Sequence, residues 1–379
     1  MTHRFALAAL AALLLAAPAR AQFAPGSPDD PDTPIDARTK AAVIESLAVA
    51  VQDRYVFADK GAALAKVLRQ RAAKHEYDRI TGSKEFADSL LAHMQAYTHD
   101  RHMRVHYRYE PLPVRSPDDE RGPTEEERRR QLDNDRIRNF GFERVQRLAG
   151  NVGYLDLRFF SGLPEAQPTA VAAMNFLANA DAIIIDVRRN GGGDPSLLQT
   201  VLTYFVAPDD RLHINDFYLR AGDRTEQFWS SSQVPGPRLN GKPLYVLTSS
   251  LTGSCAEEFA YDVQTHKLGT LYGATTAGAA NPGGMFRLSD HLAAFIATGR
   301  AINPVTKTNW EGVGVKPEVA VPPADALREA HVAALNKLLE SATDADRKAL
   351  LVRALERAKA TPSEPADEFT REGRRRMAN

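Results

Sequence analysis

Apolar residues recur every three or four positions in the part of the chain that precedes residue 100. This period places the apolar side chains on one face of an α-helix. Three such stretches predict a small N-terminal helical bundle over residues 36–102, with Ser83 as the N-cap candidate of the last helix. The stretches are marked by Val43, Leu47, Val51 and Tyr55, by Leu64, Val67 and Leu68, and by Phe86, Leu90 and Met94.

The period then changes to two. Val105, Tyr107 and Tyr109 alternate with polar residues, which predicts a strand. Residues 182–186 form a continuous apolar run, typical of a strand buried on both faces. Residues 244–247 repeat this pattern, and each run leads through a turn into a predicted helix, at 195–205 and at about 256–265. We therefore expect an α/β domain over residues 103–323, followed by a helical tail over 324–379.

Residues 111–141 form a charged insert within this domain. Three glutamates at 125–127 precede three arginines at 128–130, and Thr124 with Glu127 has the spacing of a capping box. An exposed helix is therefore expected. Its charges favour a solvated face over a lid above a binding site.

The first 21 residues carry the pattern of a secretory signal. A short cationic start precedes an apolar run from Phe5 to Pro18 and an Ala-x-Ala site at residues 19–21. The run is too short to cross a bilayer, and its lack of a polar face argues against the alternative of a short buried helix. Residues 22–35 are rich in Pro and Asp and predict a flexible leader. We expect a periplasmic or secreted protein without stable membrane insertion after signal removal.

Composition narrows the choice of function. Lys plus Arg and Asp plus Glu are equal at 48 each, which argues against nucleic acid as a partner. Removing residues 1–21 takes away Arg4 and Arg20 and no acid, so the remainder is slightly acidic. The single cysteine, Cys255, excludes a disulfide framework and any multi-cysteine metal site.

Two turns between a strand and a helix could carry chemistry. In the first, residues 248–259, Ser254 and Cys255 lie at a helix N-terminus, where backbone N–H groups favour developing negative charge. That setting suits an acyl-transfer nucleophile, although these residues could also only cap the helix. The second turn, residues 186–193, ends in three glycines and lacks the spacing of a dinucleotide or phosphate loop. It could supply an oxyanion donor or form a plain tight turn.

A serine nucleophile needs a base, usually histidine. His99, His102 and His106 cluster at the end of the helical bundle. Their spacing could suit a metal on a helix, but the helix pattern ends near Tyr97 and the H-E-x-x-H motif is absent, so no metal is expected. His102 is the preferred base, and an ordinary half-buried histidine is the alternative.

Three segments in this order resemble the tail-specific, or carboxyl-terminal-processing, serine peptidases: residues 182–193, 244–259 and 309–319. The resemblance implies a ClpP/crotonase-like mixed sheet, a polypeptide substrate and no cofactor. Glu257 matches the Glu that follows the family's nucleophile by three positions, which maps the nucleophile onto Ser254. Many members use a Lys from a Thr-x-Gly-Lys turn, but this chain has Ala279 there. That departure argues against a Ser/Lys dyad.

The sequence looks more like the branch that contains the tricorn core protease and interphotoreceptor retinoid-binding protein. That resemblance implies His102 as the base and Glu311 as the supporting acid. The backbone N–H of Cys255, with one from Gly191 or Gly192, would form the oxyanion hole. No interposed PDZ-type domain is evident, since the 111–141 insert is too short and too charged.

We therefore expect an exported serine peptidase that cleaves unfolded or tail-exposed polypeptides. The first alternative is a binding module for a hydrophobic ligand or peptide on the same fold. The second is a thiol hydrolase that uses Cys255, whose side chain should point away from the cleft. The sequence specifies no oligomeric state.

Overall fold

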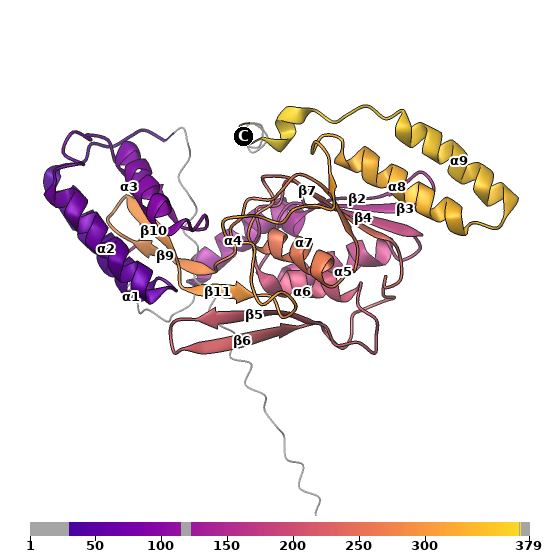
Figure 1. Cartoon of the computed structure of the whole chain (residues 1–379), viewed down its shortest axis with the longest axis horizontal. Helices are drawn as coiled ribbons and strands as arrows, with labels where there is room; N and C mark the ends of the chain where they lie inside the picture. Colours follow the sequence, from indigo (N-terminus) through magenta and orange to yellow (C-terminus); the bar gives the residue numbers. More distant parts are fainter. Residues whose placement is uncertain (1–29, 115–122, 371, 373–379) are drawn as a thin grey trace, which may run out of the picture.

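The computed structural model describes residues 30–114, 123–370 and 372 (Figure 1). The predicted signal peptide, residues 1–21, lies outside the described residues. Most of the predicted leader and residues 115–122 of the charged insert also lie outside them. The described chain contains an N-terminal group of helices, a mixed sheet with helices on both faces, and two C-terminal helices, as predicted.

The N-terminal helices are α1 (Ala37–Arg54), α2 (Ala58–Ala73) and α3 (Ser83–Thr98), which confirms the helical period of the sequence. Asp36 caps α1, since its carboxylate accepts a hydrogen bond from the Thr39 backbone at 2.7 Å. The expected cap of α3 was wrong by one position. Gly82 is the N-cap, and Ser83 is the first helical residue.

A three-stranded antiparallel sheet completes the core of these helices. Its strands are β1 (Arg104–Tyr107), β10 (Leu292–Ala297) and β9 (Gly283–Arg287), in that order. Leu47 and Leu90 from the helices are fully buried in one cluster with Ile296 from β10. The helical bundle therefore shares its core with strands that follow it by almost 200 residues in the sequence.

The central sheet has six strands in the order β12-β8-β7-β4-β3-β2. All neighbouring pairs are parallel except β2 with β3, which places the antiparallel strand β2 at one edge. The strands are β2 (Phe142–Leu148), β3 (Val152–Leu157), β4 (Ala182–Asp186), β7 (Leu244–Thr248), β8 (Thr270–Gly273) and β12 (Val319–Ala320).

Helices cover both faces of this sheet, which explains the continuous apolar run in β4. Ile183 and Ile185 pack towards α5 (Gln167–Phe176), α6 (Pro195–Thr203) and α7 (Cys255–Thr265). Ile184 packs on the opposite face towards α8 (Ala326–Ser341) and α9 (Ala345–Lys359). Because successive strand residues point to opposite faces, both sets must be apolar.

The remaining elements lie around these two cores. A third sheet pairs β5 (His213–Leu219) with β6 (Arg224–Trp229) and β11 (Gly299–Ile302). The charged helix α4 (Glu125–Ile137) begins with the predicted capping box of Thr124 and Glu127 and is largely exposed. Short 3₁₀ turns are η1 (Asn139–Gly141), η2 (Pro164–Ala166) and η3 (Ala366–Phe369). Within the described ranges, no helix has the length and apolarity needed to cross a bilayer.

Candidate active site

The two turns singled out in the sequence meet at one edge of the central sheet. Strands β4 and β7 are parallel neighbours, so the turns that follow them leave from the same edge. The Gly253 N–H donates to the Asn190 carbonyl at 3.0 Å. A Cβ atom at Gly192 would lie 2.7 Å from Ser254 Cβ, so only glycine allows this approach.

Ser254 occupies the turn between β7 and α7 in an unusual backbone conformation. Its φ of 52° and ψ of −124° lie in a region that residues with a Cβ rarely adopt. It is also the N-cap residue of α7, at the positive end of the helix dipole. Strain of this kind at a strand-to-helix turn is typical of an exposed nucleophile.

Two backbone N–H groups beside Ser254 are free of partners within the described chain. The Cys255 N–H begins α7 and has no helical acceptor, and the Gly191 N–H makes no hydrogen bond among these residues. The Gly192 N–H, in contrast, donates to Asn190 Oδ1 at 2.8 Å. The N–H groups of Gly191 and Cys255 therefore remain available to a further acceptor, whereas that of Gly192 is occupied.

Glu257 ties this turn to a third segment, residues 276–281. Its carboxylate accepts hydrogen bonds from the Ser254 N–H at 2.9 Å and the Thr276 hydroxyl at 2.5 Å. It also accepts from the Gly278 and Ala279 N–H groups, at 2.6 and 2.9 Å. Burial raises the pKa of Glu257, while these hydrogen bonds oppose the rise. Glu257 therefore has a structural role: both of its carboxylate oxygens accept hydrogen bonds that join the Ser254 turn to the 276–281 segment.

His102 lies between α3 and β1, at the opposite end of the same segment. Its Nδ1 is 2.6 Å from the Asn281 carbonyl, and its ring packs on Phe295 with centroids 4.7 Å apart. Because a carbonyl can only accept, the contact places the proton on Nδ1 and leaves Nε2 as the unprotonated nitrogen of the neutral ring. Burial lowers the pKa of His102, and the nearby Asp100 carboxylate opposes the decrease.

Glu311 accepts hydrogen bonds from the residue before His102 and from the segment that contacts the His102 ring, but not from the ring itself. Oε1 accepts from the Arg101 N–H at 2.7 Å, and Oε2 accepts from the Ala280 and Asn281 N–H groups at 2.7 and 3.2 Å. Burial, and then the charge of Asp100, raise the pKa of Glu311 to about 7. Among the hydrogen bonds of the described residues, none joins the His102 ring to Glu311 or to Ser254.

Sequence reasoning gave no role to Asp100 and Asn281. Buried Asp100 accepts from the His102 N–H at 3.0 Å, the Tyr55 hydroxyl at 3.2 Å and the Asn281 amide at 3.0 Å. An Asp two positions before the base is the signature of an Asx turn and could have been noticed. Nothing in the sequence around Asn281 indicates that its carbonyl would accept a hydrogen bond from His102 Nδ1.

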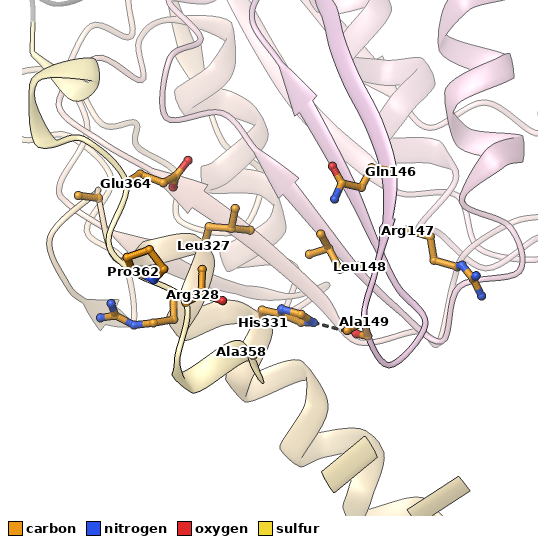
Figure 2. A pocket seen from close by; sticks show the side chains of 12 residues that line it. Gln146, Arg147, Leu148, Ala149, Leu327, Arg328, His331, Ala358, Pro362 and Glu364 are labelled. Atoms are coloured by element: carbon orange, nitrogen blue, oxygen red, sulfur yellow. Dashed lines mark hydrogen bonds between the residues drawn. The ribbon is translucent and has the colours of Figure 1, made fainter. Parts of the chain in front are cut away.

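A cavity of about 260 Å³ lies beside this segment, lined by Gln95, His99, Arg101 and Gly312. A second cavity, of about 270 Å³, lies elsewhere, between the β2 edge and the C-terminal helices (Figure 2). Among the described residues, no three His, Cys, Asp or Glu side chains are grouped so as to hold a metal ion.

Two models of one known protein family match this chain. The profile of peptidase family S41 matches residues 151–321. The profile of the N-terminal domain of this family in eukaryotic interphotoreceptor retinoid-binding protein matches residues 37–138. Together the two matches extend over most of the described chain.

Solved structures are similar to this chain at low sequence identity. A candidate peptidase from Parabacteroides merdae is 19% identical, covers 80% of this chain and 99% of its own, and has a TM-score of 0.53. The photosystem II D1 C-terminal processing protease is 16% identical, covers 76% and 94%, and has a TM-score of 0.47. The tricorn protease is 13% identical, covers 84% of this chain but 37% of its own, and also has a TM-score of 0.47.

The family profiles match the segments that carry the Gly-rich turn, Ser254 and the preceding helical region. This is the family expected from the three sequence segments. The chain therefore belongs to peptidase family S41, and it is a serine-type peptidase.

Proposed function

We propose that Ser254 is the nucleophile of this peptidase, that His102 is its general base, and that Glu311 positions the base. The observation that carries the proposal is the strained Ser254 at the start of α7, in contact with Gly192. The 276–281 segment supports it, because hydrogen bonds join this segment to the Ser254 turn at one end and to His102 at the other.

In the proposed reaction, His102 Nε2 accepts the Ser254 hydroxyl proton while Oγ attacks the carbonyl carbon of the peptide bond. The carbonyl oxygen becomes an oxyanion, and the Cys255 and Gly191 N–H groups donate to it. As the C–N bond breaks, His102 returns the proton to the leaving amine. Water, deprotonated by His102, then hydrolyses the acyl-enzyme and restores Ser254.

The roles of the other residues follow from their contacts. Glu311 fixes the backbone of Arg101 and Asn281, and thereby the ring of the base between them. The Cys255 thiol is buried, and burial raises its pKa well above the usual value, which opposes the thiol-hydrolase alternative. The backbone of Cys255 then contributes to the reaction, and its sulfur does not.

The proposed substrate is an unfolded or tail-exposed polypeptide outside the cytoplasm. Export rests on the signal pattern of residues 1–21. Cleavage of this segment should leave Gln22 as the first residue of the exported protein. N-terminal sequencing of the mature protein tests this, and an uncut Met1 or retention inside the cell would contradict it.

Substitution Ser254→Ala tests the catalytic assignment. Hydrolysis of an unfolded protein should fall to background without loss of folding, because the nucleophile alone is removed. Ser250→Ala is the matched control, since Ser250 is an exposed hydroxyl of the same turn. A fluorophosphonate probe should label Ser254 in the wild-type protein. An unlabelled Ser254 together with stoichiometric binding of a hydrophobic ligand would favour the binding module instead.

A further inference from the structure

The chain beyond α9 returns to two arginines, Arg188 and Arg189, which lie in the turn that ends in three glycines. Residues 361–370, the C-terminal strap, run back from the end of α9 towards the middle of the molecule and end in η3 (Figure 1). Arg188 and Arg189 follow β4 and immediately precede Asn190 and Gly191. Both arginines are buried.

The strap holds both guanidinium groups. Arg188 Nη1 donates to Glu364 Oε2 at 2.5 Å, and Arg189 Nη1 donates to Glu368 Oε2 at 2.5 Å. The Phe369 ring lies over both, with its centroid 4.4 Å from the guanidinium carbon of Arg188 and 5.4 Å from that of Arg189. An aromatic face over a buried guanidinium adds a cation–π attraction to the two ion pairs.

Strand carboxylates hold the arginines from the other side. Arg188 donates to Asp186 through Nε at 2.9 Å and Nη2 at 2.6 Å. Arg189 Nη2 donates to Asp156 at 3.1 Å. Each arginine is thus fixed between a carboxylate of the sheet and a carboxylate of the strap, and removing either partner leaves a buried charge with poorer compensation.

This arrangement continues directly into the proposed oxyanion hole. The Arg188 carbonyl accepts from the Ser249 hydroxyl at 2.5 Å, which ties the arginine pair to the turn that carries Ser254. Asn190, which follows the arginine pair, accepts two hydrogen bonds. Its carbonyl accepts from the Gly253 N–H, and its Oδ1 accepts from the Gly192 N–H. A displacement of Arg188 or Arg189 should therefore also shift Asn190 and Gly191, whose N–H is a proposed oxyanion donor.

The start of the strap has anchors of its own, among them Arg328, which donates to the Ser363 hydroxyl at 3.2 Å. Thr361, Pro362 and Glu364 border the cavity of about 270 Å³ next to α8 and β2 (Figure 2). Ser363 donates to Asp325 at 2.5 Å, and the Glu364 N–H donates to the Ala324 carbonyl at 3.0 Å. The arginine contacts attach its later part, where Glu368 and Phe369 lie.

We propose that the C-terminal strap holds the turn of residues 186–193 in the position that its oxyanion donor requires. Glu368 and Phe369 are the positioning residues. The inference rests on the proposed function, since it assigns the strap to that reaction. The strap touches neither the nucleophile nor the base, and it acts through the arginine pair.

The test compares Glu368→Gln and Phe369→Ala with Arg347→Gln. Arg347 is the control because it ion-pairs α9 to Asp181, a contact of the same C-terminal region with no link to the arginine pair. Both strap variants should lose about 10-fold in kcat with KM within about 2-fold, because misaligned donors weaken transition-state stabilisation alone. Arg347→Gln should lower the Tm yet keep kcat, and Phe369→Tyr should restore kcat because it keeps the ring.

Hydrogen exchange separates this inference from the proposed function. Exchange of the amides of residues 189–193 should speed up in Glu368→Gln and Phe369→Ala but not in Arg347→Gln, whether or not the protein cleaves peptides. If exchange there stays at the wild-type rate, or if kcat is unchanged while Tm falls, the strap serves stability only and the inference is wrong. If Ser254 neither cleaves nor labels while exchange responds, the proposed function fails and only the mechanical link remains.

Discussion

Three buried or half-buried carboxylates surround the proposed nucleophile and base, and each accepts several hydrogen bonds from its surroundings. Glu257 holds the Ser254 turn, Asp100 holds the start of the His102 segment, and Glu311 holds the backbone before and beside that histidine. Backbone N–H donors lower the cost of keeping a carboxylate out of water. At the scale of single residues, these acids therefore fix backbone geometry.

Glu311→Gln should change the pH dependence of catalysis. The pKa of Glu311 is raised to about 7, so its carboxylate charges only as the pH rises through neutrality. Protonation below that pH costs at least one of its three backbone hydrogen bonds and loosens the His102 segment. We expect wild-type kcat/KM to fall as the pH drops through about 7. In Glu311→Gln this limb should vanish and the maximum should fall about 10-fold or more.

The lowered pKa of His102 should leave a separate acid limb below pH 6.5, because the base is lost only when the ring is protonated. Glu318→Gln is the matched control, since Glu318 also accepts a backbone N–H, from Leu271, away from the site. A wild-type profile that is flat from pH 6 to 8 would contradict the role given to Glu311.

At the scale of elements, two parallel strands and the helices after them create the site. The turns after β4 and β7 converge because the strands are neighbours, and α7 then directs its N-terminus at the Ser254 turn. This convergence requires a backbone approach at Gly192 that leaves no room for a side chain.

Gly192→Ala should inactivate the enzyme. The added Cβ would meet Ser254 Cβ at 2.7 Å and the Gly253 carbonyl at 2.9 Å, and φ is +111°. We expect kcat to fall by about 100-fold or more, since both the nucleophile and an oxyanion donor must shift. Gly241→Ala separates this effect from backbone strain, because Gly241 has φ of +80° with nothing within 4 Å. It should cost about 1 kcal/mol of stability at unchanged kcat.

Glu258→Gln should alter the pH dependence of stability. Burial, and next the charge of Asp194, raise the pKa of Glu258 to about 7, against a single hydrogen bond from Asn215. The folded state therefore keeps a proton that the unfolded state releases near pH 4.5. The resulting stabilisation is full below pH 4.5 and is lost as the pH rises through about 7.

In Glu258→Gln this loss should shrink, so the Tm difference between pH 5 and pH 8 should decrease by a few degrees, about 2–4 °C per kcal/mol. Thermal unfolding at the two pH values measures it. The exposed Glu340→Gln serves as control and should follow the wild-type curve. An unchanged pH dependence in Glu258→Gln would contradict the assignment.

At the scale of the whole molecule, neither end of the chain closes a core alone. The N-terminal helices bury their apolar faces together with β1, β9 and β10, and the C-terminal helices cover one face of the central sheet. His102, the proposed base, lies where the helical region meets β1, and its position depends on contacts with Asn281 and, through Arg101, with Glu311.

Met94→Ala tests whether this shared core unfolds with the rest. Met94 is fully buried in α3, and its truncation should cost about 2–5 kcal/mol. Calorimetry should show a single transition at a lower Tm, because the N-terminal helices build this core together with the distant strands β9 and β10. Val49→Ala, at a position 43% exposed in α1, should leave the Tm nearly unchanged. Two separate transitions would instead support an independent N-terminal domain over residues 36–102.

The local elements were predictable to within a few residues. The period of three to four predicted the three N-terminal helices, and the period of two predicted strand β1, since side-chain direction repeats within each element. Continuous apolar runs predicted the buried strands β4 and β7. Thr124 was predicted as a cap and is one, because capping depends on neighbouring residues only. The edge strand β2 and the pair β5–β6 were missed, since their half-exposed residues give a weaker pattern.

The sequence by itself determined most of the elements, the strand-to-helix turn with its serine, and the resemblance to a peptidase family. Only the tertiary structure decided which atoms meet. It directs Glu311 to the Arg101 N–H, 210 residues away, instead of to the His102 ring. In the folded chain the Gly192 N–H donates to Asn190, and Arg189 donates to Glu368. The physical reason is that propensity and periodicity act within an element, whereas such contacts follow from strand order and from the packing of distant segments.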